Sequence, residues 1–330
     1  MLKSRLNLSL TYFDEHRTDE ILESETSSTA GISSILINAG DIKRSGFELE
    51  MGGTPIKTKD FKWNIALNWS NPTTEVLSLA EGQERQLIGE YSLDHRSSFG
   101  VTELTNLPGK EWGQLVGKAI KRNSEGVPIV TSAGLYEYEA DYNFGSVLPD
   151  YIGGLVNSFT YKGLTLSGSI SFQKGGKFFS LSEWWGTQTG LLSNTVGDND
   201  LGNPVRDAVA DGGGVHVVGV DNTGVAVDTY VDAHTYYAQY YSQRIAEPFI
   251  HDASYIKLSD LSFSYSFPKK ILGNVLESAT FGIFGRNLGM LSVSKDNTHN
   301  WDPSELSYQW GEDGGLPGTR SVGFNAKLTF

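Results

Sequence analysis

The chain has 330 residues, of which 38 are glycine and none is cysteine, and its 26 basic and 39 acidic side chains leave a formal net charge of −13. The lack of cysteine excludes a disulfide scaffold, a thiolate metal site and a thiol nucleophile, and the acidic balance disfavours nucleic acid, whose phosphates need clustered Lys and Arg. Only 38% of the residues are apolar, and no window approaches the roughly 18 consecutive apolar residues of a transmembrane helix.

The first segment of the chain alternates polar and apolar residues. Residues 1–12 therefore lack the continuous apolar core of a signal peptide. From residue 5 onwards Leu6, Leu8 and Leu10 share one parity, which is the period of a β-strand. The same period returns along the whole chain and predicts ten strands. In chain order they span 5–13, 46–51, 61–70, 92–104, 111–121, 149–161, 163–173, 260–267, 278–288 and 321–330.

The connections between these strands alternate in length. The short ones are 54–60, 105–110, 162–163 and 268–277, and the long ones are 14–42, 71–91, 122–148, 174–252 and 289–318. Strict alternation gathers all long loops at one end of an up-and-down antiparallel sheet, which is the layout of outer-membrane barrels. The clearest strands have about 10 residues, enough to span an apolar band of about 25 Å when tilted, whereas soluble strands average roughly 5–6.

The sequence therefore predicts an all-β fold, a transmembrane antiparallel up-and-down β-barrel. The apolar parity would face lipid, and the Ser, Thr and Asn parity would face the lumen. A soluble sandwich would place its apolar parity inside, so parity alone leaves both architectures open.

Five segments that follow one another along the chain resemble the C-terminal part of SusC/RagA-type TonB-dependent outer-membrane transporters. They are 38–70, 148–181, 252–269 (DASYIKLSDLSFSYSFPK), 284–288 (FGRNL) and 319–330 (TRSVGFNAKLTF). The resemblance implies a barrel of about 22 strands with a plug domain in its lumen. It also implies a location in the outer membrane of a Gram-negative bacterium and import of oligosaccharides or peptides. TonB would drive the import, and a SusD-like surface lipoprotein would act as a lid.

On this resemblance, residues 1–330 would be the C-terminal portion of such a barrel, with about ten of its strands. A signal peptide, a TonB box and a plug domain are expected to be absent from the chain. The alternatives are a soluble all-β carbohydrate-binding protein and a self-contained passive or adhesive outer-membrane barrel. The resemblance also implies that Phe330, a terminal aromatic residue, is recognised by the barrel-assembly machinery, although Phe330 could instead simply complete the apolar face of its strand.

The longest predicted loop, 174–252, carries ten acidic and four basic side chains and is rich in aromatic residues. Aromatic faces beside Asp, Asn and Gln suit an oligosaccharide, whose C–H faces stack on rings while its hydroxyl groups form hydrogen bonds. A peptide is the other substrate class, and packing of the loop is an equally good explanation of the aromatic residues. The candidate substrate-binding residues are Trp184, Trp185, Tyr236, Tyr237, Tyr240 and Tyr241.

Catalytic and metal-binding patterns are weak. The six histidines are scattered, no pair has a helical zinc spacing, and no Gly-x-Ser-x-Gly motif occurs. We therefore predict surface histidines, no catalytic residue, no enzyme activity and no cofactor. The acidic loop residues could bind calcium, but the EF-hand pattern is absent and solvated carboxylates are favoured. These residues are Asp198, Asp200, Asp211, Asp296 and Asp302.

Overall fold

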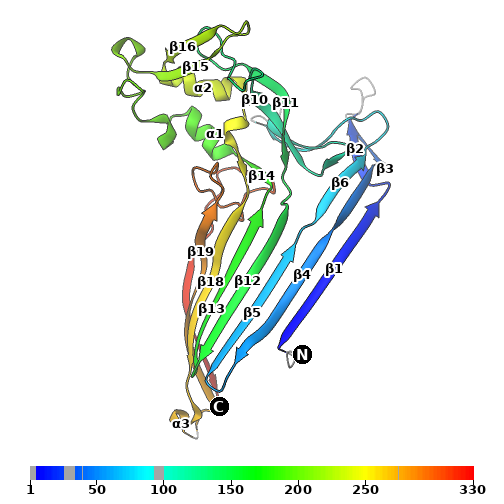
Figure 1. Cartoon of the computed structure of the whole chain (residues 1–330), viewed down its shortest axis with the longest axis vertical. Helices are drawn as coiled ribbons and strands as arrows, with labels where there is room; N and C mark the ends of the chain where they lie inside the picture. The colour runs from blue at the N-terminus through cyan, green and yellow to red at the C-terminus, as the bar shows by residue number, and fades with distance from the viewer. Residues whose placement is uncertain (1–4, 26–33, 39, 93–99, 274) are drawn as a thin grey trace.

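A curved sheet of long antiparallel strands makes up one half of the protein, and folded loops cover one of its ends, called here the loop end (Figure 1). The computed structural model describes residues 5–25, 34–38, 40–92, 100–273 and 275–330. Across the sheet the long strands follow their order in the chain. They are β1 (Leu6–Arg17), β4 (Asp41–Lys57), β5 (Phe61–Ser70), β12 (Tyr151–Tyr161), β13 (Leu164–Lys174), β18 (Tyr255–Ser266), β19 (Ser278–Val293) and β21 (Ser321–Thr329).

Two shorter strands complete this ten-stranded sheet. Strand β6 (Thr73–Ser78) pairs with β4 beyond the point where β5 ends, and β9 (Lys110–Glu111) pairs with β6. Among the described residues β1 and β21 form the two edges of the sheet and do not pair with each other. The predicted up-and-down antiparallel arrangement is confirmed.

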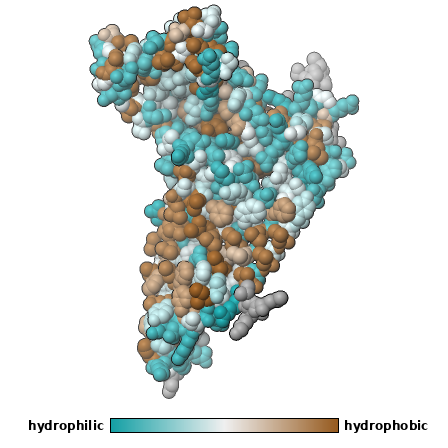
Figure 2. All heavy atoms as spheres, in the orientation of Figure 1, coloured by the Kyte–Doolittle hydropathy of each residue, from teal (hydrophilic) through white to brown (hydrophobic). Residues whose placement is uncertain are grey.

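One face of the long sheet is apolar from strand to strand. A single row of directly paired residues crosses six strands: Trp63, Phe159, Leu166, Phe263, Ile283 and Phe324. Figure 2 shows an apolar surface over the long strands that face the viewer. In this row Ile283 and Phe324 are 62% and 81% exposed. A soluble sandwich would bury this parity, and soluble monomers rarely expose so large an apolar surface. The exposed face therefore supports the lipid-facing assignment.

Aromatic rings lie at both ends of the apolar face. Near the loop end the ring of Tyr151 lies 6.2 Å from that of Trp69 and 6.4 Å from that of Phe172. At the opposite end, called here the turn end, the rings of Phe267 and Phe281 are 5.8 Å apart. In the β13–β18 register the two belts lie about ten residues apart, which for tilted strands corresponds to roughly 25 Å. This is the height of the apolar band of an outer-membrane barrel.

Two of the ten predicted strands lie outside the long sheet. The segment 111–121 forms β10 (Gln114–Ile120), and the described part of 92–104 enters β8 (Gly100–Asn106), while residues 93–99 lie outside the described residues. Both strands belong to a four-stranded sheet at the loop end with β7 (Gln86–Ser92) and β11 (Tyr138–Ser146). A period of two is common to all sheets, so it does not reveal which sheet a strand joins.

Because β8 and β10 lie outside the long sheet, the connections between its strands differ from the predicted ones. Residues 105–110 are not a turn at the turn end. The predicted loop 122–148 and residues 79–91 of the predicted loop 71–91 belong to one excursion of 79–150 between β6 and β12, and β6 itself occupies the start of the predicted loop 71–91. The remaining long connections are 18–40, 175–254 and 294–320, and the short ones are 58–60, 162–163 and 267–277. The alternation of long and short connections is thus retained with fewer strands.

Most of the connection between β13 and β18 is folded. Its elements are β14 (Lys177–Ser180), α1 (Leu181–Gln188), the 3₁₀ turns Ser193–Thr195, Val209–Asp211 and Glu247–Phe249, the hairpin β15 (Val215–Val220) and β16 (Ala226–Val231), α2 (Ala233–Gln243) and β17 (Ile250–Asp252). Elsewhere, β2 (Ile21–Glu25) pairs with β3 (Ser34–Asn38), β20 (Gly311–Glu312) pairs with β14, and α3 (Lys269–Leu272) lies at the turn end. Within the described ranges no helix is long and apolar enough to cross a membrane.

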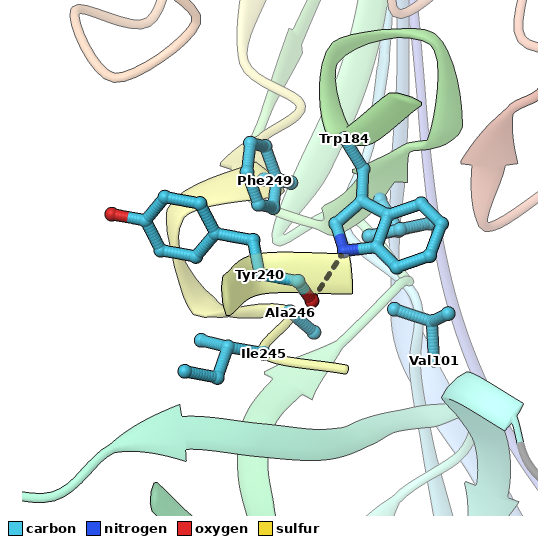
Figure 3. Packing of buried hydrophobic residues seen from close by; sticks show 7 residues of the cluster. Val101, Trp184, Tyr240, Ile245, Ala246 and Phe249 are labelled. Atoms are coloured by element: carbon cyan, nitrogen blue, oxygen red, sulfur yellow. Dashed lines mark hydrogen bonds between the residues drawn. The ribbon is translucent and has the colours of Figure 1, made fainter. Parts of the chain in front are cut away.

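The largest buried core lies at the loop end and not in the long sheet. It consists of Val101, Phe179, Trp184, Tyr240, Ile245, Ala246 and Phe249 (Figure 3). Val101 comes from the excursion 79–150 and the other six residues from 175–254, so the core joins the two longest connections. This core positions the candidate functional residues.

Candidate functional site

The six candidate aromatic residues come from two short helices that pack against each other. The side chain of Ser180 caps α1 by accepting a hydrogen bond from the backbone N–H of Glu183, and that of Asp232 caps α2 through the N–H of Thr235. Trp184, in the first half of α1, donates its indole N–H to the carbonyl of Tyr240, in the second half of α2, at 3.2 Å. This hydrogen bond joins the two helices.

Two of the six candidates are core residues. Trp184 is fully buried and Tyr240 is 7% exposed, and both belong to the core of the loop end (Figure 3). The Tyr240 ring packs edge-on against Phe249, with their centroids 5.4 Å apart. For these two residues the structure supports the packing explanation.

Tyr236 and Tyr237 are half-buried, and their hydroxyl groups are bound by the protein. The Tyr236 hydroxyl lies 3.2 Å from that of Tyr136, and the Tyr237 hydroxyl donates to the carbonyl of Asn194 at 2.9 Å. Burial, followed by the charge of Tyr240, raises the pKa of Tyr236, although the hydrogen bond with Tyr136 lowers it. Burial also raises the pKa of Tyr237 despite the opposing charge of Arg206. Both groups remain neutral hydrogen-bonding side chains at physiological pH.

Trp185 and Tyr241 form an exposed ring pair beside the core. Each is 38% exposed, and their ring centroids lie 5.4 Å apart at an interplanar angle of 41°. On α2, Tyr236 and Tyr240 share one face while Tyr237 and Tyr241 share another, because residues four apart align on a helix. The spacing therefore separates the buried Tyr240 from the accessible Tyr241, and the half-buried Tyr236 and Tyr237 lie one turn earlier on the same two faces.

A pocket of about 280 Å³ lies one helical turn from this ring pair, between the end of α1 and the start of α2. Tyr237, Gln188 and Arg206 line it. Arg206 donates to the carbonyl of Gly190 at 2.6 Å and to the carbonyl and hydroxyl oxygens of Thr195 at 3.0 and 2.8 Å. Sequence analysis missed this pocket because a single arginine in an acidic loop has no distinguishing pattern.

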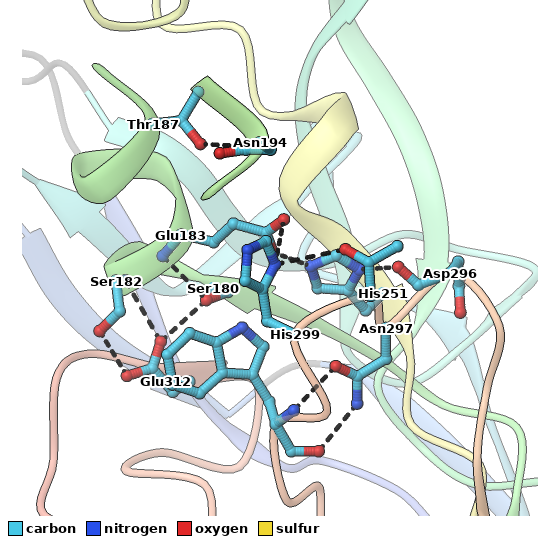
Figure 4. Close-up of polar contacts among 12 residues, drawn as sticks. Ser180, Ser182, Glu183, Thr187, Asn194, His251, Asp296, Asn297, His299 and Glu312 are labelled. Atoms are coloured by element: carbon cyan, nitrogen blue, oxygen red, sulfur yellow. Dashed lines mark hydrogen bonds and ion pairs between the residues drawn. The ribbon is translucent and has the colours of Figure 1, made fainter. Parts of the chain in front are cut away.

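A buried polar junction connects the long loops (Figure 4). Glu183 on α1 contacts Nε2 of His251 at 2.5 Å and Nδ1 of His299 at 3.0 Å, and the second nitrogen of His251 lies 2.9 Å from the carbonyl of Asp296. His251 is only 2% exposed, so its prediction as a surface residue was wrong. The residues are 68 and 45 positions apart along the chain, a separation that sequence spacing does not bridge.

Glu312 forms the second half of this junction. Its carboxylate accepts hydrogen bonds from the hydroxyl of Ser180 at 2.9 Å and from the hydroxyl and N–H of Ser182 at 2.6 and 3.2 Å. Because Ser180 donates to Glu312, it is not aligned on either imidazole as a nucleophile would be. The junction fastens the loop 294–320 to the start of α1.

The acidic candidates do not form a shared centre. The carboxylate of Asp302 pairs with the buried amine of Lys257 at 2.8 Å, and that of Asp296 accepts the N–H of Asp252 at 3.0 Å. Within the described part of the chain no cluster of three His, Asp or Glu side chains has the arrangement of a metal site. Asp211 is the last residue of the 3₁₀ turn Val209–Asp211, and Asp198 pairs with Pro204 in an isolated bridge.

Asp200 belongs to a surface network on the β15–β16 hairpin. Nδ1 of His216 lies 3.0 Å from Asp200 and Nε2 lies 2.8 Å from Asp228, and the imidazole stacks on Tyr230. The hydrogen bond to Asp228 raises the pKa of His216, burial lowers it, and the charges of Asp200 and Asp228 raise it further, which leaves it above 6.5.

Phe330 follows β21 directly at the turn end, where Figure 1 marks the C-terminus, and is 80% exposed. Leu328, two residues earlier, pairs with Ala279 on the same strand parity. The exposed ring is accessible, as a recognition signal requires, and it equally continues the alternation of its strand.

Comparison with known proteins places these observations in a family. No model of a protein family matches the sequence. TonB-dependent receptor P3 of Formosa agariphila is 21% identical over 311 residues, covering 87% of this chain and 28% of the relative. TonB-dependent receptor P26 of the same organism is 22% identical, covering 100% of this chain and 33% of the relative. The chain thus spans about a third of the length of these relatives.

Solved structures give the same result for the fold. The RagAB peptide importer in its closed-closed state matches with a TM-score of 0.66 and 17% identity, covering 99% of this chain and 34% of that chain. The RagAB peptide transporter matches with a TM-score of 0.66 and 15% identity, covering 99% and 33%. Together with its exposed apolar face, these matches show that the chain has the fold of the corresponding part of RagA-type barrels and is similar over most of its length to TonB-dependent receptors, which reside in the outer membrane of Gram-negative bacteria.

Proposed function

We propose that the protein containing this chain imports short peptides across the outer membrane with energy delivered by TonB. The observation that carries the proposal is the match of 99% of the chain to the RagAB peptide importer. In this proposal residues 1–330 supply the C-terminal part of the barrel wall together with its extracellular loops. Coupling to TonB would act through parts of the receptor outside this chain, and the family consists of transporters and not of enzymes.

The loop end would be the extracellular side, where ligand and lid meet the receptor. Long loops of outer-membrane barrels are extracellular and short turns are periplasmic, and all four long connections here lie at one end. A SusD-like surface lipoprotein is the partner expected there, by analogy with the two-component RagAB assembly. Phe330, at the turn end, would be read by the barrel-assembly machinery during insertion.

Within the loop end, the ring pair Trp185–Tyr241 is the proposed contact surface for the ligand. Its two rings are both accessible and adjacent, whereas Trp184 and Tyr240 are buried and would support them from below. Each ring offers apolar area with little loss of side-chain entropy on binding.

An oligosaccharide is the second candidate ligand, and the same ring pair favours it. Two rings inclined at 41° present faces on which the C–H groups of a sugar can stack, and an acidic loop does not disfavour a neutral glycan. Offering peptides and oligosaccharides to the same cells shows which of the two classes the receptor imports.

The test is uptake by cells that carry the complete receptor. We expect isotopically labelled short peptides to accumulate, and a protonophore to abolish the accumulation. The double substitution Trp185→Ala with Tyr241→Ala should lower uptake about tenfold, since two ring contacts are lost. Tyr138→Ala, a substitution of another exposed tyrosine at the loop end, is the matched control and should leave uptake unchanged.

Three results would contradict parts of this proposal. Uptake that persists with the protonophore would exclude TonB-driven import. Uptake of neutral oligosaccharides with no uptake of peptides would contradict peptide import and make oligosaccharides the ligand. Normal uptake by the double variant would remove the ring pair from the binding surface.

A further inference from the structure

The pocket beside the ring pair contains a cation that the protein fixes in place but does not neutralise. Three hydrogen bonds from Arg206 all end on uncharged oxygens, those of Gly190 and Thr195. Among the described residues Arg206 takes part in no ion pair. In the connection 175–254 carboxylates outnumber basic groups, so Arg206 has several potential partners along its own segment.

A second polar side chain that lines the pocket has an atom without a partner. The side-chain oxygen Oε1 of Gln188 is buried and accepts no hydrogen bond from the described residues. A buried acceptor left without a donor costs about 1–3 kcal/mol. Such a cost is explicable when a ligand supplies the donor.

The single carboxylate that lines the pocket caps α2 and does not pair with the guanidinium. Oδ1 of Asp232 accepts hydrogen bonds from the N–H of Thr235 at 3.0 Å and from its hydroxyl at 3.2 Å, as the N-terminal cap of α2. Among the described residues Asp232 forms no ion pair with Arg206. The pocket thus combines an unneutralised guanidinium, an unpaired acceptor and the ring of Tyr237.

We propose that this pocket binds a carboxylate of the imported ligand, with Arg206 pairing with the carboxylate and Gln188 accepting a hydrogen bond from an adjacent donor of the same ligand. A guanidinium matches the two oxygens of a carboxylate geometrically. The C-terminal residue of a peptide carries both groups, because its free carboxylate and its own N–H are attached to one Cα. This inference rests on the proposed function and specifies which end of a peptide the receptor recognises.

The size and place of the pocket fit a terminal residue. Its volume of about 280 Å³ lies at the lower limit of small-molecule sites, so it would hold one residue and leave the remainder of a peptide outside. Tyr237 lines the pocket and Tyr241 lies one turn further along α2, about 6 Å away along the axis. The next residues of the peptide would then contact the Trp185–Tyr241 ring pair.

The experiment compares free and blocked carboxylates on the complete receptor, purified in detergent and immobilised. The probes are tetrapeptides of random sequence as free acids and the same mixture amidated at the C-terminus, quantified together by mass spectrometry. We expect the free acids to be retained at least about tenfold more than the amides, as a charge-assisted hydrogen bond pair implies. This comparison needs no substitution, so it does not depend on how a variant folds.

Substitutions then assign the effect to the pocket. Arg206→Gln should reduce the ratio of retained acid to retained amide to about one. Arg85→Gln is the matched control, because Arg85 is another arginine of the loop end but already pairs with Glu103 and Asp141, and it should keep the ratio. Gln188→Leu removes the acceptor and should weaken retention of the acids several-fold while the ratio persists.

An acidic sugar tests whether the bound carboxylate belongs to a peptide or to an oligosaccharide. Digalacturonate and its methyl ester are offered to the same receptor. Preference for digalacturonate with no retention of peptides would keep the carboxylate subsite and overturn peptide import. Equal retention of peptide acids and amides by the unsubstituted receptor would overturn the subsite and leave peptide import standing. An acid preference that survives Arg206→Gln would also refute the assignment to this pocket.

Discussion

Substituting Trp184 separates a core residue from a binding residue within the same aromatic segment. Trp184 is fully buried, packs among the seven residues of the loop-end core and donates its indole N–H to Tyr240. Trp184→Ala should therefore cost about 3–5 kcal/mol of stability in the folded connections around this core, called here the loop body. Trp185→Ala, one position later, removes a ring that is 38% exposed and should cost about 1–2 kcal/mol.

Hydrogen exchange measured by mass spectrometry on the complete receptor can read this difference locally. A loss of about 4 kcal/mol corresponds to amide exchange roughly 1000-fold faster where exchange requires opening of the loop body. The effect should appear in peptides from 178–184 and 239–249, while the long strands keep their protection. If Trp184→Ala left this protection unchanged, or if Trp185→Ala removed more of it, the assignment of Trp184 to the core would be refuted.

Three further outcomes test other parts of the structure. Ile283→Lys on the apolar face should cost about 2–4 kcal/mol and lower the amount of folded receptor in the membrane, whereas Ser262→Lys on the opposite face should be tolerated; equal amounts would contradict the lipid-facing assignment. The raised pKa of His216 means that its bridge is present below pH 6.5 and is lost as pH rises through that pKa, and an NMR titration should show the pKa falling on Asp228→Asn. Deleting Phe330 from the complete receptor should reduce its assembly in the outer membrane, and normal assembly would leave the ring as part of the strand face alone.

The long sheet could be predicted from sequence because its information is local. The alternation around Trp63 and Phe159 records which face each residue occupies, and the strand length records the thickness of the membrane. Assigning β8 and β10 to the barrel failed because a buried sheet at the loop end uses the same period. Their burial on both faces, which distinguishes them, depends on segments far away in the chain.

The candidate site was only partly accessible to sequence reasoning for the same physical reason. The i, i+4 spacing on α2 places Tyr237 and Tyr241 on one face and Tyr236 and Tyr240 on another, so helix geometry could have divided the four tyrosines once α2 was recognised. The junction of Glu183 with His251 depends on contacts between connections remote in sequence. Arg206 carries no local signal, because what distinguishes it is a set of contacts in the folded loop, three hydrogen bonds to uncharged oxygens and no ion pair among the described residues.

The buried junction at Glu183 has a consequence for engineering this receptor. Glu183 contacts His251 of its own connection, 175–254, and also His299 of the connection 294–320. Glu312 of 294–320 in turn binds Ser180 and Ser182 of 175–254. The two connections are therefore one interchangeable module and not two. A chimaera that receives 175–254 alone would bury the carboxylate of Glu183 with one of its imidazole partners absent, at a cost of several kcal/mol. Loop exchange between such receptors should therefore succeed only when both segments are transferred together.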